Sequence, residues 1–399
     1  MAGTNGFSVS RYAPQRGTFA KLTARDSMVR RLDWPLLFSA VALSVIGSLL
    51  VWSATRGRET LNHGDPYYFL FRHVLNTGIG IGLMVGTIWL GHRTLRGAVP
   101  VLYGISVVLV LLVLTPLGAT INGAHAWIVI GGGFSLQPSE FVKITIILGM
   151  AMMLAARVDA GDQLHPDHRT VAKSLGLAAL PIAIVMLMPD LGSVMVMAMI
   201  VLGVLLASGA PNRWIFGLLG TGVLGAVLVA ALGLLDEYQI NRFAAFANPE
   251  LDPSGVGYNT NQARIAIGSG GLAGTGLFKG SQTTGQFVPE QQTDFVYTVA
   301  GEELGFLGAG LILVLLGVVL WRACRIARET SELYGTIVAA GIIAWFAFQA
   351  FENIGMTLGI MPVAGLPLPF VSYGGSSMFA VWVAIGLLQS IRVQRPITA

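Results

Sequence analysis

The chain has 399 residues, of which 54% are apolar and only 11% are charged. Soluble domains carry roughly 25% charged residues, so this composition excludes a soluble globular protein and indicates a membrane protein, in agreement with a mean hydropathy of +0.70. The formal net charge of +4 gives little support to a nucleic-acid partner, because in a multispan protein the position of the charges matters more than their sum.

The basic N-terminal segment, residues 1–32, comes before the first apolar run. No small-residue cleavage site follows that run, so we expect a retained cytoplasmic tail rather than a signal peptide. Residues 33–395 are expected to form one membrane domain. Its apolar segments have about the 20 residues that a helix needs to cross a bilayer. We therefore predict an all-α polytopic membrane protein with about ten transmembrane helices, at residues 33–53, 73–91, 97–115, 141–157, 174–188, 191–208, 213–235, 296–321, 335–359 and 373–391.

The basic residues predict the orientation of these helices. Lys and Arg number 17 in the tail and the loops on its side, against 6 in the loops on the other side. The positive-inside rule then places both termini in the cytoplasm, and the long loop at residues 236–295 becomes extracellular. Its run GSGGLAGTG, residues 268–276, superficially resembles a dinucleotide fingerprint, but no strand precedes it. We expect these glycines to give flexibility or to let the main chain approach a head group closely.

An acidic stretch, VPEQQTDFVYTVAGEELGFLG, occupies residues 288–308 at the start of the eighth segment. Glu290 and Asp294 are four residues apart and share a face if the helix has begun by Glu290, with Glu302 and Glu303 two turns further on. A charge near hydrocarbon costs about 2.5–3.5 kcal/mol, so acids at this depth usually face a wet cavity or a partner. A solvated first turn that complements the helix dipole is equally compatible with the spacing.

Two other outer loops are rich in turn residues. One carries Trp127, Ile128 and Ile130, which we expect to lie flat at the membrane interface. The other contains three prolines and ends in Gly-Gly-Ser376-Ser377. Non-helical backbone is tolerated at membrane depth where it lines a watery cavity, so both loops are predicted to rim one outward-facing pocket.

Charged residues also occur within or at the ends of the apolar segments. Glu140 and Lys143 are three residues apart, which lets them pair on one helix face, and Asp190 lies near the outer boundary. We expect these three residues to order the pocket from beneath; an ion pair that only orders helix packing is the alternative. Glu352 and Asn353 are interpreted as contacts between helices.

Five motifs together carry a family resemblance: FSLQPSEFVK from Phe134, PDLGS from Pro189, NPELDPSGVGYNTNQARIAIGSGGLAGTGL from Asn248, the acidic stretch above, and GIMPVAGLPLPFVSYGGSS from Gly359. They resemble the SEDS family (shape, elongation, division and sporulation) of bacterial peptidoglycan glycosyltransferases. The resemblance covers nearly the whole chain from about residue 33 to residue 391. The sequences of these motifs are most similar to RodA, the elongation branch of the family, and less similar to FtsW, the division branch. A role in division is the alternative. Many members have an arginine before the tryptophan of the third-to-fourth loop, where this chain has Ala126, so no cationic role is carried over to that loop.

This resemblance implies that lipid II is polymerised at the outer face of the bacterial cytoplasmic membrane. The 4-hydroxyl of one disaccharide attacks the anomeric carbon of another chain's terminal sugar and displaces undecaprenyl diphosphate. The family's motif aspartate corresponds to Asp294, with the implied role of general base, worth about 10²–10⁴ in rate for a well-placed group. A nearby Glu290 would raise the pKa of Asp294 by like-charge repulsion. The diphosphate is already a good leaving group, so no second acid is needed.

The departing diphosphate needs positive charge, because negative charge grows on its oxygens as the bond breaks. Arg242 and Lys279 in the long outer loop are the candidate substrate-binding cations, with Arg264 a weaker one, and each is also compatible with a simple surface charge. A divalent cation, Mg²⁺ or Mn²⁺, at the diphosphate is the alternative, although no His or Cys cluster demands a metal. The expected substrate-binding set is completed by Glu290, Trp127, Ser376 and Ser377.

Two other functions fit the same features. A flippase or transporter of lipid-linked precursors also needs many helices and intramembrane charges, but the two halves of the sequence show no convincing repeat, and the carboxylates lie at the outer boundary rather than at the midplane. The second alternative is a non-catalytic scaffold for a penicillin-binding protein. The resemblance implies a class B penicillin-binding protein, a transpeptidase, as partner in either case, together with lipid II and membrane lipids.

Overall fold

The computed structural model describes residues 28–394, except 122–123, 132–133, 189 and, between 234 and 254, all residues but Arg242 and Phe246. The basic tail up to residue 27 and much of the first half of the predicted extracellular loop therefore lie outside the described residues. The elements are α2 Met28–Arg31, α3 Trp34–Thr55, α4 Glu59–Asn62, α5 Tyr68–Leu90, α6 His92–Val113, β1 Gly118–Ile121, β2 Ala124–Gly131, β3 Phe134–Leu136, α7 Pro138–Asp159, α8 His168–Met186, α9 Leu191–Ala207, α10 Asn212–Ala231, α12 Val256–Ser269, α13 Ser281–Thr284, α14 Val296–Val299, the π-helix η2 Ala300–Leu304, α15 Gly305–Glu329, α16 Leu333–Leu358 and α17 Gly375–Val393.

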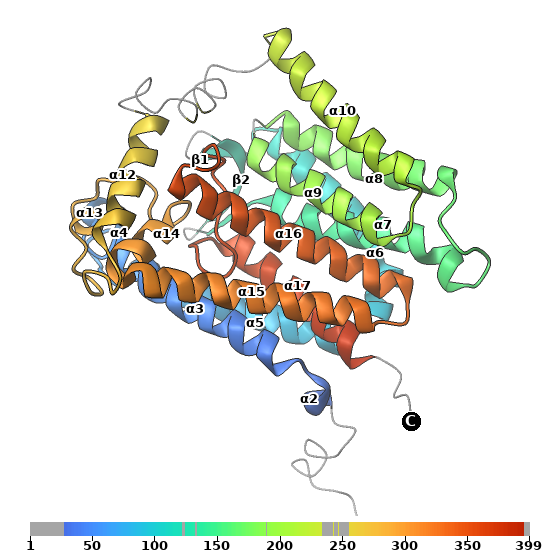
Figure 1. Ribbon diagram of the computed structural model, residues 1–399, viewed down its shortest axis with the longest axis horizontal. Helices are drawn as coiled ribbons and strands as arrows, with labels where there is room; N and C mark the ends of the chain where they lie inside the picture. The colour runs from blue at the N-terminus through green and yellow to red at the C-terminus, as the bar shows by residue number, and fades with distance from the viewer. Residues whose placement is uncertain are drawn as a thin grey trace, which may run out of the picture.

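The long helices form one bundle (Figure 1). Eight spans in the described part of the chain are long and apolar enough to cross a membrane, counting Val296–Glu329 as one, and α9 is a shorter apolar helix. With the 20-residue α10, each of the ten predicted segments corresponds to a helix, so the all-α polytopic fold is confirmed. Three helices, α5, α6 and α8, begin five or six residues earlier than predicted, because polar residues in first turns are missed by a search for apolar runs.

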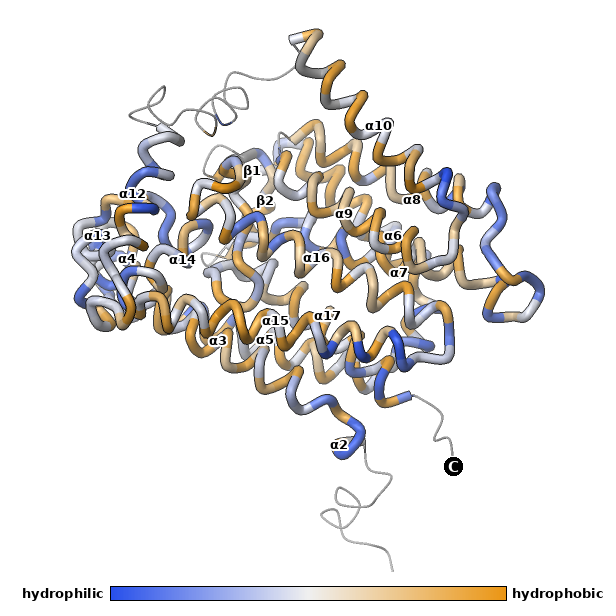
Figure 2. Tube along the Cα trace, in the orientation of Figure 1, coloured by the Kyte–Doolittle hydropathy of each residue, from blue (hydrophilic) through white to orange (hydrophobic). Residues whose placement is uncertain are grey.

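Hydropathy follows this architecture: apolar helices lie between polar ends (Figure 2). The helices α7, α16 and α17 are the most buried of the spans, with α17 packed on α5 and α16 packed on α7 and α9. Aromatic rings run through the core in sequence, from Trp345 and Phe346 to Phe370 and Trp382, with ring centroids 5.2, 5.4 and 5.9 Å apart. Such tilted and edge-on pairs are the arrangement that aromatic quadrupoles favour.

A small antiparallel sheet, β1-β2-β3, was not predicted. Its register pairs Gly118 with Ile128 and Ile128 with Leu136. We expected Trp127, Ile128 and Ile130 to lie flat at the interface; Trp127 instead lines a cavity, whereas Ile130 is exposed. His125 is held by the Val113 carbonyl oxygen, 2.8 Å from its Nε2.

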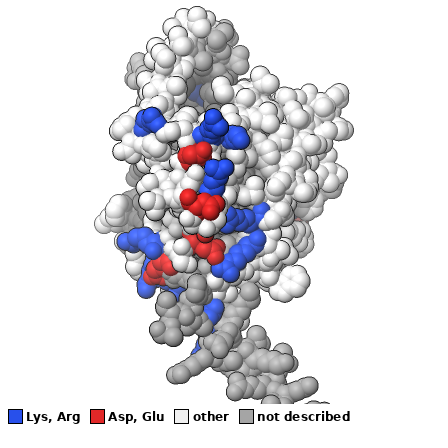
Figure 3. All heavy atoms as spheres, turned by 90° about the vertical axis from the view of Figure 1, so that its right-hand side faces the viewer, with Lys and Arg blue, Asp and Glu red and all other residues white. Residues whose placement is uncertain are grey.

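The end of the bundle where the described chain begins and stops is rich in Lys and Arg, mixed with acids (Figure 3). Ion pairs there join separate connections: Arg93 with Glu332, and Arg96 with Asp159 at 3.1 Å. This charge distribution agrees with the positive-inside pattern.

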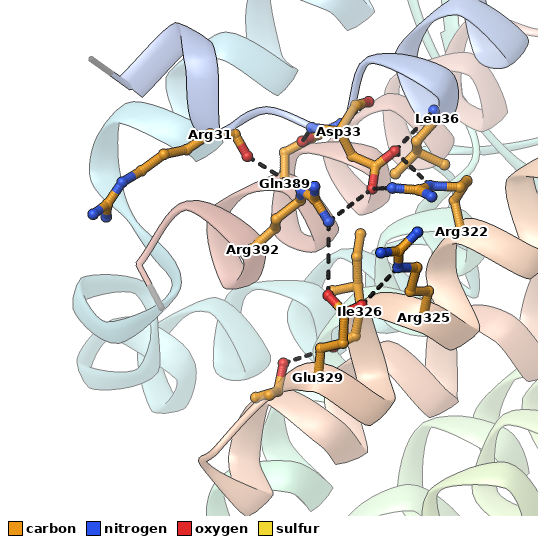
Figure 4. Close-up of polar contacts among 10 residues, drawn as sticks. Arg31, Asp33, Leu36, Arg322, Arg325, Ile326, Glu329, Gln389 and Arg392 are labelled. Carbon is orange, nitrogen blue, oxygen red and sulfur yellow. Dashed lines mark hydrogen bonds and ion pairs between the residues drawn. The ribbon is translucent and has the colours of Figure 1, made fainter. Parts of the chain in front are cut away.

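At the same end, a buried cluster around Asp33 ties three helices together (Figure 4). The Asp33 carboxylate accepts hydrogen bonds from Arg322 Nε at 2.8 Å and Nη2 at 2.6 Å and pairs with Arg392 Nη1 at 3.1 Å. Its backbone N–H donates to Gln389 Oε1, whose amide donates back to the Asp33 carbonyl. We call these four residues the Asp33 clasp; it joins the start of α3 to the ends of α15 and α17.

At the opposite end, the glycine-rich run packs against the π-helix η2. The N–H groups of Thr275 and Gly276 donate to the carbonyls of Glu302 and Glu303, at 3.0 and 3.1 Å. A Cβ on Gly274 would lie 2.1 Å from the Glu303 carbonyl oxygen, so only glycine fits. The close approach that the sequence predicted is therefore to the protein's own main chain rather than to a head group.

Candidate active site

A cavity of about 380 Å³ opens at the end of the bundle opposite the Asp33 clasp. Its walls come from the sheet, from the N-terminus of α9, from the turn before α14, and from the loop between α16 and α17. The prediction that the second and last outer loops rim one pocket agrees with these walls. Among the predicted site residues it is lined by Trp127, Asp190, Arg242, Glu290, Asp294 and Ser377.

Asp294 is the residue with the most unusual electrostatics in this cavity. Burial raises the pKa of its carboxyl to about 7, and the neighbouring Glu290 adds to the rise, while Arg242 opposes it. Desolvation disfavours the charged form and a like charge does the same. The carboxyl therefore sits at the midpoint of its titration near neutral pH, where an acid can both take up and release a proton.

The closeness of Glu290 and Asp294 was predicted for the wrong reason. The helix does not include them; it begins at Val296. Instead, Glu290 has a left-handed backbone, with φ +50°, and its carbonyl accepts from the N–H groups of Thr293, Asp294 and Phe295 at 3.1–3.2 Å. This tight turn directs both carboxylates to the cavity without a shared helix face.

The predicted acidic cluster is divided in two. Glu302 accepts hydrogen bonds from the N–H groups of Gln282 and Thr283, at 2.7 and 2.9 Å, and Glu303 accepts one from Ser53 Oγ at 2.6 Å. Neither lines the cavity. They hold the outer loop to the bundle.

Arg242 and Asp294 converge on one glycine. A Cβ on Gly365 would lie 3.5 Å from Asp294 Oδ2 and 3.8 Å from Arg242 Nη2. Gly365 has φ +69°, a backbone conformation that side chains disfavour. The open main chain here leaves room for a ligand atom between the two charges.

Two of the three residues expected to order the pocket lie outside it. Lys143 Nζ donates to Glu140 Oε1 at 2.7 Å and to Gln349 Oε1 at 3.2 Å. Gln349 in turn donates to the carbonyl of Pro367 at 2.7 Å, a residue of the cavity wall. The ion pair therefore connects to the wall through one side chain.

Asp190, by contrast, belongs to the cavity itself. It caps α9 by accepting from the Ser193 N–H at 3.0 Å, and it accepts from Gln137 at 3.3 Å. Asn353, which we expected to contact other helices, donates to the carbonyls of Asp294 and Leu366 at 2.7 and 2.6 Å, so it fixes two walls relative to each other.

Other predicted site residues lie apart from the cavity. Lys279 is exposed and lines neither of the two described cavities, because its loop is held against η2. Arg264 on α12 is also exposed. Ser376 is buried and accepts a hydrogen bond from the Gln137 N–H at 2.9 Å, so it joins α17 to the sheet.

Sequence reasoning missed Arg72, which lines a second cavity of about 250 Å³ beside the first. Its guanidinium lies 4.4 Å above the Tyr68 ring, and it opposes the rise that burial causes in the pKa of Tyr373. The only sequence signal is an arginine after a cluster of aromatic residues at the start of an apolar run.

Comparisons with known proteins agree with this arrangement. The FtsW/RodA/SpoVE model, described as cell cycle protein, matches residues 34–396. The chain is 37% identical over 363 residues to stage V sporulation protein E of Bacillus subtilis (strain 168), covering 90% of this chain and 96% of that protein. It is 35% identical over 370 residues to peptidoglycan glycosyltransferase MrdB of Escherichia coli (strain K12), covering 91% and 94%.

A solved structure extends the comparison to the fold. It is described as showing the structural coordination of polymerization and crosslinking by a peptidoglycan synthase complex. One of its chains is 31% identical to this chain, with a TM-score of 0.73 and coverage of 90% of this chain and 97% of that chain. The chain therefore belongs to the FtsW/RodA/SpoVE family of cell cycle proteins.

Proposed function

We propose that this protein is a peptidoglycan glycosyltransferase that polymerises lipid II at the outer face of the cytoplasmic membrane. The observation that carries the proposal is Asp294, an acid whose pKa is raised to about 7 in a cavity of the polar membrane boundary. The sequence identity of the chain to the sporulation protein and to MrdB is nearly equal, at 37% and 35%. The proposal therefore concerns the reaction that these relatives share and not a role in elongation or division.

In the proposed reaction, the ionised Asp294 takes the proton of a sugar 4-hydroxyl. The hydroxyl oxygen then bonds to the anomeric carbon of the second sugar. The bond from that carbon to the diphosphate oxygen breaks, and its electron pair leaves with undecaprenyl diphosphate. A base with a pKa near the working pH is the most effective for such a step, and Glu290 contributes by keeping the pKa of Asp294 from falling to its ordinary value.

Positive charge for the leaving diphosphate is proposed to come from the protein and from a divalent cation. Arg242 lies beside Asp294 in the cavity. The carboxylate oxygens of Glu290 are the ligand type that Mg²⁺ and Mn²⁺ take, which leaves Asp294 free as the base, and such an ion would neutralise phosphate charge when bound. The described residues contain no group of three or more His, Cys, Asp and Glu side chains that alone could hold a metal, so phosphate oxygens would have to complete its coordination.

Orientation and partner are part of the same proposal. The Lys- and Arg-rich end would face the cytoplasm with both termini, which leaves the Asp294 cavity open to the outside. The solved structure of a peptidoglycan synthase complex is described as coordinating polymerization with crosslinking, which supports a crosslinking partner; we propose that this partner is a class B penicillin-binding protein.

The experiment uses purified full-length protein, alone and with its penicillin-binding protein, supplied with fluorescent lipid II in detergent or liposomes. Products are sized on a gel. We expect glycan strands from the wild type, and a loss of at least about 10²-fold in rate for Asp294→Asn and Asp294→Ala, because a positioned general base contributes about that much.

The matched control is Lys279→Gln, a charge removal in the same outer loop but outside the cavity, which should retain wild-type rates. Gel filtration of each variant checks that it is folded. Polymerisation by Asp294→Asn at the wild-type rate would exclude the general-base role. Transport of lipid II across liposomes without polymer would support a flippase instead.

A further inference from the structure

Residues 288–294, which we call the Glu290 turn, carry both cavity carboxylates but belong to no helix. Hydrogen bonds from the last part of the chain hold the second half of this turn. The Tyr373 N–H donates to the Gln292 carbonyl at 2.8 Å, and the Asn353 amide donates to the Asp294 carbonyl at 2.7 Å. Because both bonds end on residues after Glu290, the first half of the turn has to be held from elsewhere.

Arg58, in the connection between α3 and α4, holds that first half. Its Nη2 donates to the Val288 carbonyl at 2.9 Å and to Gln291 Oε1 at 3.3 Å. The side chain is only 7% exposed, and it lines neither of the two described cavities. Arg58 therefore contacts the Glu290 turn without reaching a substrate in either cavity.

The burial of Arg58 is compensated by the turn that it contacts. Burial lowers the pKa of the guanidinium, whereas the negative charge of Glu290 raises it. Its Nε has no hydrogen-bond partner among the described residues. A buried cation is stable only where opposite charge and acceptors surround it. The Glu290 turn supplies two oxygen acceptors and one carboxylate, so the arginine and the turn depend on each other.

The connection that carries Arg58 is itself fixed to the end of α3. Asn62 is 1% exposed, and its amide donates to the carbonyl of Thr55, the last residue of α3, at 3.2 Å. The Gln286 amide donates to the Gly57 carbonyl at 3.0 Å, which ties the same connection to the segment before the turn. The position of Arg58 is therefore set by a transmembrane helix and not by a free loop.

We propose that Arg58 is a positioning residue for the polymerisation reaction. Through its bonds to the Glu290 turn, it fixes the place of the Glu290 and Asp294 carboxylates in the cavity. The inference rests on the proposed function and deepens it, because a general base has to lie within hydrogen-bond reach of the hydroxyl that it deprotonates. A displacement of 1 Å can lower the rate by about 10²-fold.

The first measurement follows the turn itself and needs no activity. Hydrogen exchange of the full-length protein in nanodiscs is read by mass spectrometry on the peptide of residues 288–296. Its Thr293 and Phe295 N–H groups both bond to the Glu290 carbonyl at 3.2 Å, so they report whether the turn is closed. We expect Arg58→Met to speed their exchange by at least about tenfold, the size expected for a hydrogen bond to a charged group. Peptides from α16 should exchange as in the wild type.

The second measurement is the rate of lipid II polymerisation at several lipid II concentrations. Arg58→Met should lower kcat by at least about tenfold and leave KM within about twofold, because the place of the base affects proton transfer more than binding. Arg58→Lys should recover most of kcat, since a single nitrogen makes both bonds and an ammonium can replace it. An arginine that only stabilises the fold would lower the amount of folded protein and leave kcat per folded molecule unchanged.

Arg56→Met is the matched control. Arg56 is an exposed arginine two residues earlier in the same connection, and its guanidinium lies 4.6 Å from the centre of the Phe278 ring. The variant should match the wild type in exchange and in kcat. If Arg58→Met does not fold, Gln291→Leu removes one of the two acceptors instead and should change both readouts by about fivefold.

The two measurements separate this proposal from the proposed function. Wild-type exchange of the 288–296 peptide in Arg58→Met would overturn the positioning role, as would an equal effect of Arg56→Met. Polymerisation by Arg58→Met with the wild-type kcat would refute that role and leave the glycosyltransferase intact. Absence of polymerisation by the wild type would refute the glycosyltransferase, and faster exchange in Arg58→Met would still show that Arg58 holds the turn.

Discussion

Two aspartates at opposite ends of the bundle show what the same side chain does in different surroundings. Asp33 is fully buried, and both of its carboxylate oxygens are engaged by Arg322, with Arg392 as a second cation. Asp294 faces a cavity, has Glu290 beside it, and has a pKa raised to about 7. Asp33 is fully paired with cations and therefore serves the structure. Asp294 has less opposite charge around it, so its carboxyl can gain and lose a proton near neutral pH.

The largest effect on stability is expected when the Asp33 clasp is broken. Asp33→Asn leaves Arg322 buried without its counterion, and breaking one partner of a buried pair costs about 3–5 kcal/mol. We expect a clear fall in the apparent melting temperature of the purified protein. Arg325→Gln, which removes an exposed pair with Glu329, is the control and should have little effect. Equal melting temperatures for both variants would show that the clasp does not hold the fold.

The matching substitution at the other aspartate should have the opposite sign. An acid whose pKa is higher in the folded state than in the unfolded state binds more protons when folded, so stability falls as the pH rises from about 3.8 to about 7. Asp294→Asn removes that cost, and we expect it to stabilise the protein by about 2 kcal/mol at pH 8, after allowance for the side chain's contact with water. The difference from wild type should shrink at pH 5. An Asp294→Asn variant less stable than wild type at pH 8 would contradict the contrast drawn between Asp33 and Asp294.

A third prediction uses the pH dependence of the rate. The base must be ionised to accept a proton, so polymerisation should rise with pH through about 7 and level off above it. Below pH 6 the rate should fall about tenfold per pH unit. Rates of lipid II polymerisation from pH 5 to 9 test this. Glu290→Gln removes the like charge and should move the midpoint to lower pH; an unchanged midpoint would exclude coupling between the two acids.

The smallest effect on stability is expected at Glu303, which was predicted to lie with Asp294 but lies apart from it. Ser53→Ala removes the hydrogen bond to Glu303, and we expect a loss of about 1 kcal/mol in stability with little change in the polymerisation rate. Thermal unfolding and the lipid II assay measure the two effects. A large loss of activity at unchanged stability would mean that Glu303 belongs with Asp294 after all.

The sequence was sufficient for the fold because long apolar runs have few alternatives in a membrane. It also predicted that Asp294 and Glu290 lie close together, although their proximity comes from a left-handed turn at Glu290 rather than from a helix. Lys279 looked equivalent to Arg242 because both lie in one loop. Hydrogen bonds from Thr275 and Gly276 to η2 determine where that loop lies, and no local pattern predicts them.

Arg72 was missed for a related reason. On its own it is one arginine at the start of an apolar segment, and it was counted only as a charge in an outer loop. The cavity that it lines is formed together with the N-terminus of α17, which lies about 300 residues further along the chain and meets α5 only in three dimensions. The three-stranded sheet escaped prediction because β1 and β3 have only four and three residues and both strand pairs contain a register shift.

The bonds between the glycine-rich run and η2 have a consequence for how the protein opens. Thr275 and Gly276 lie in a connection outside the membrane, yet their N–H groups donate to carbonyls of the helix that continues into the bilayer. Local unfolding of either segment would therefore break the hydrogen bonds of the other. The amide hydrogens of this outer connection should therefore exchange with solvent as slowly as those of the span itself, far more slowly than ordinary surface loops.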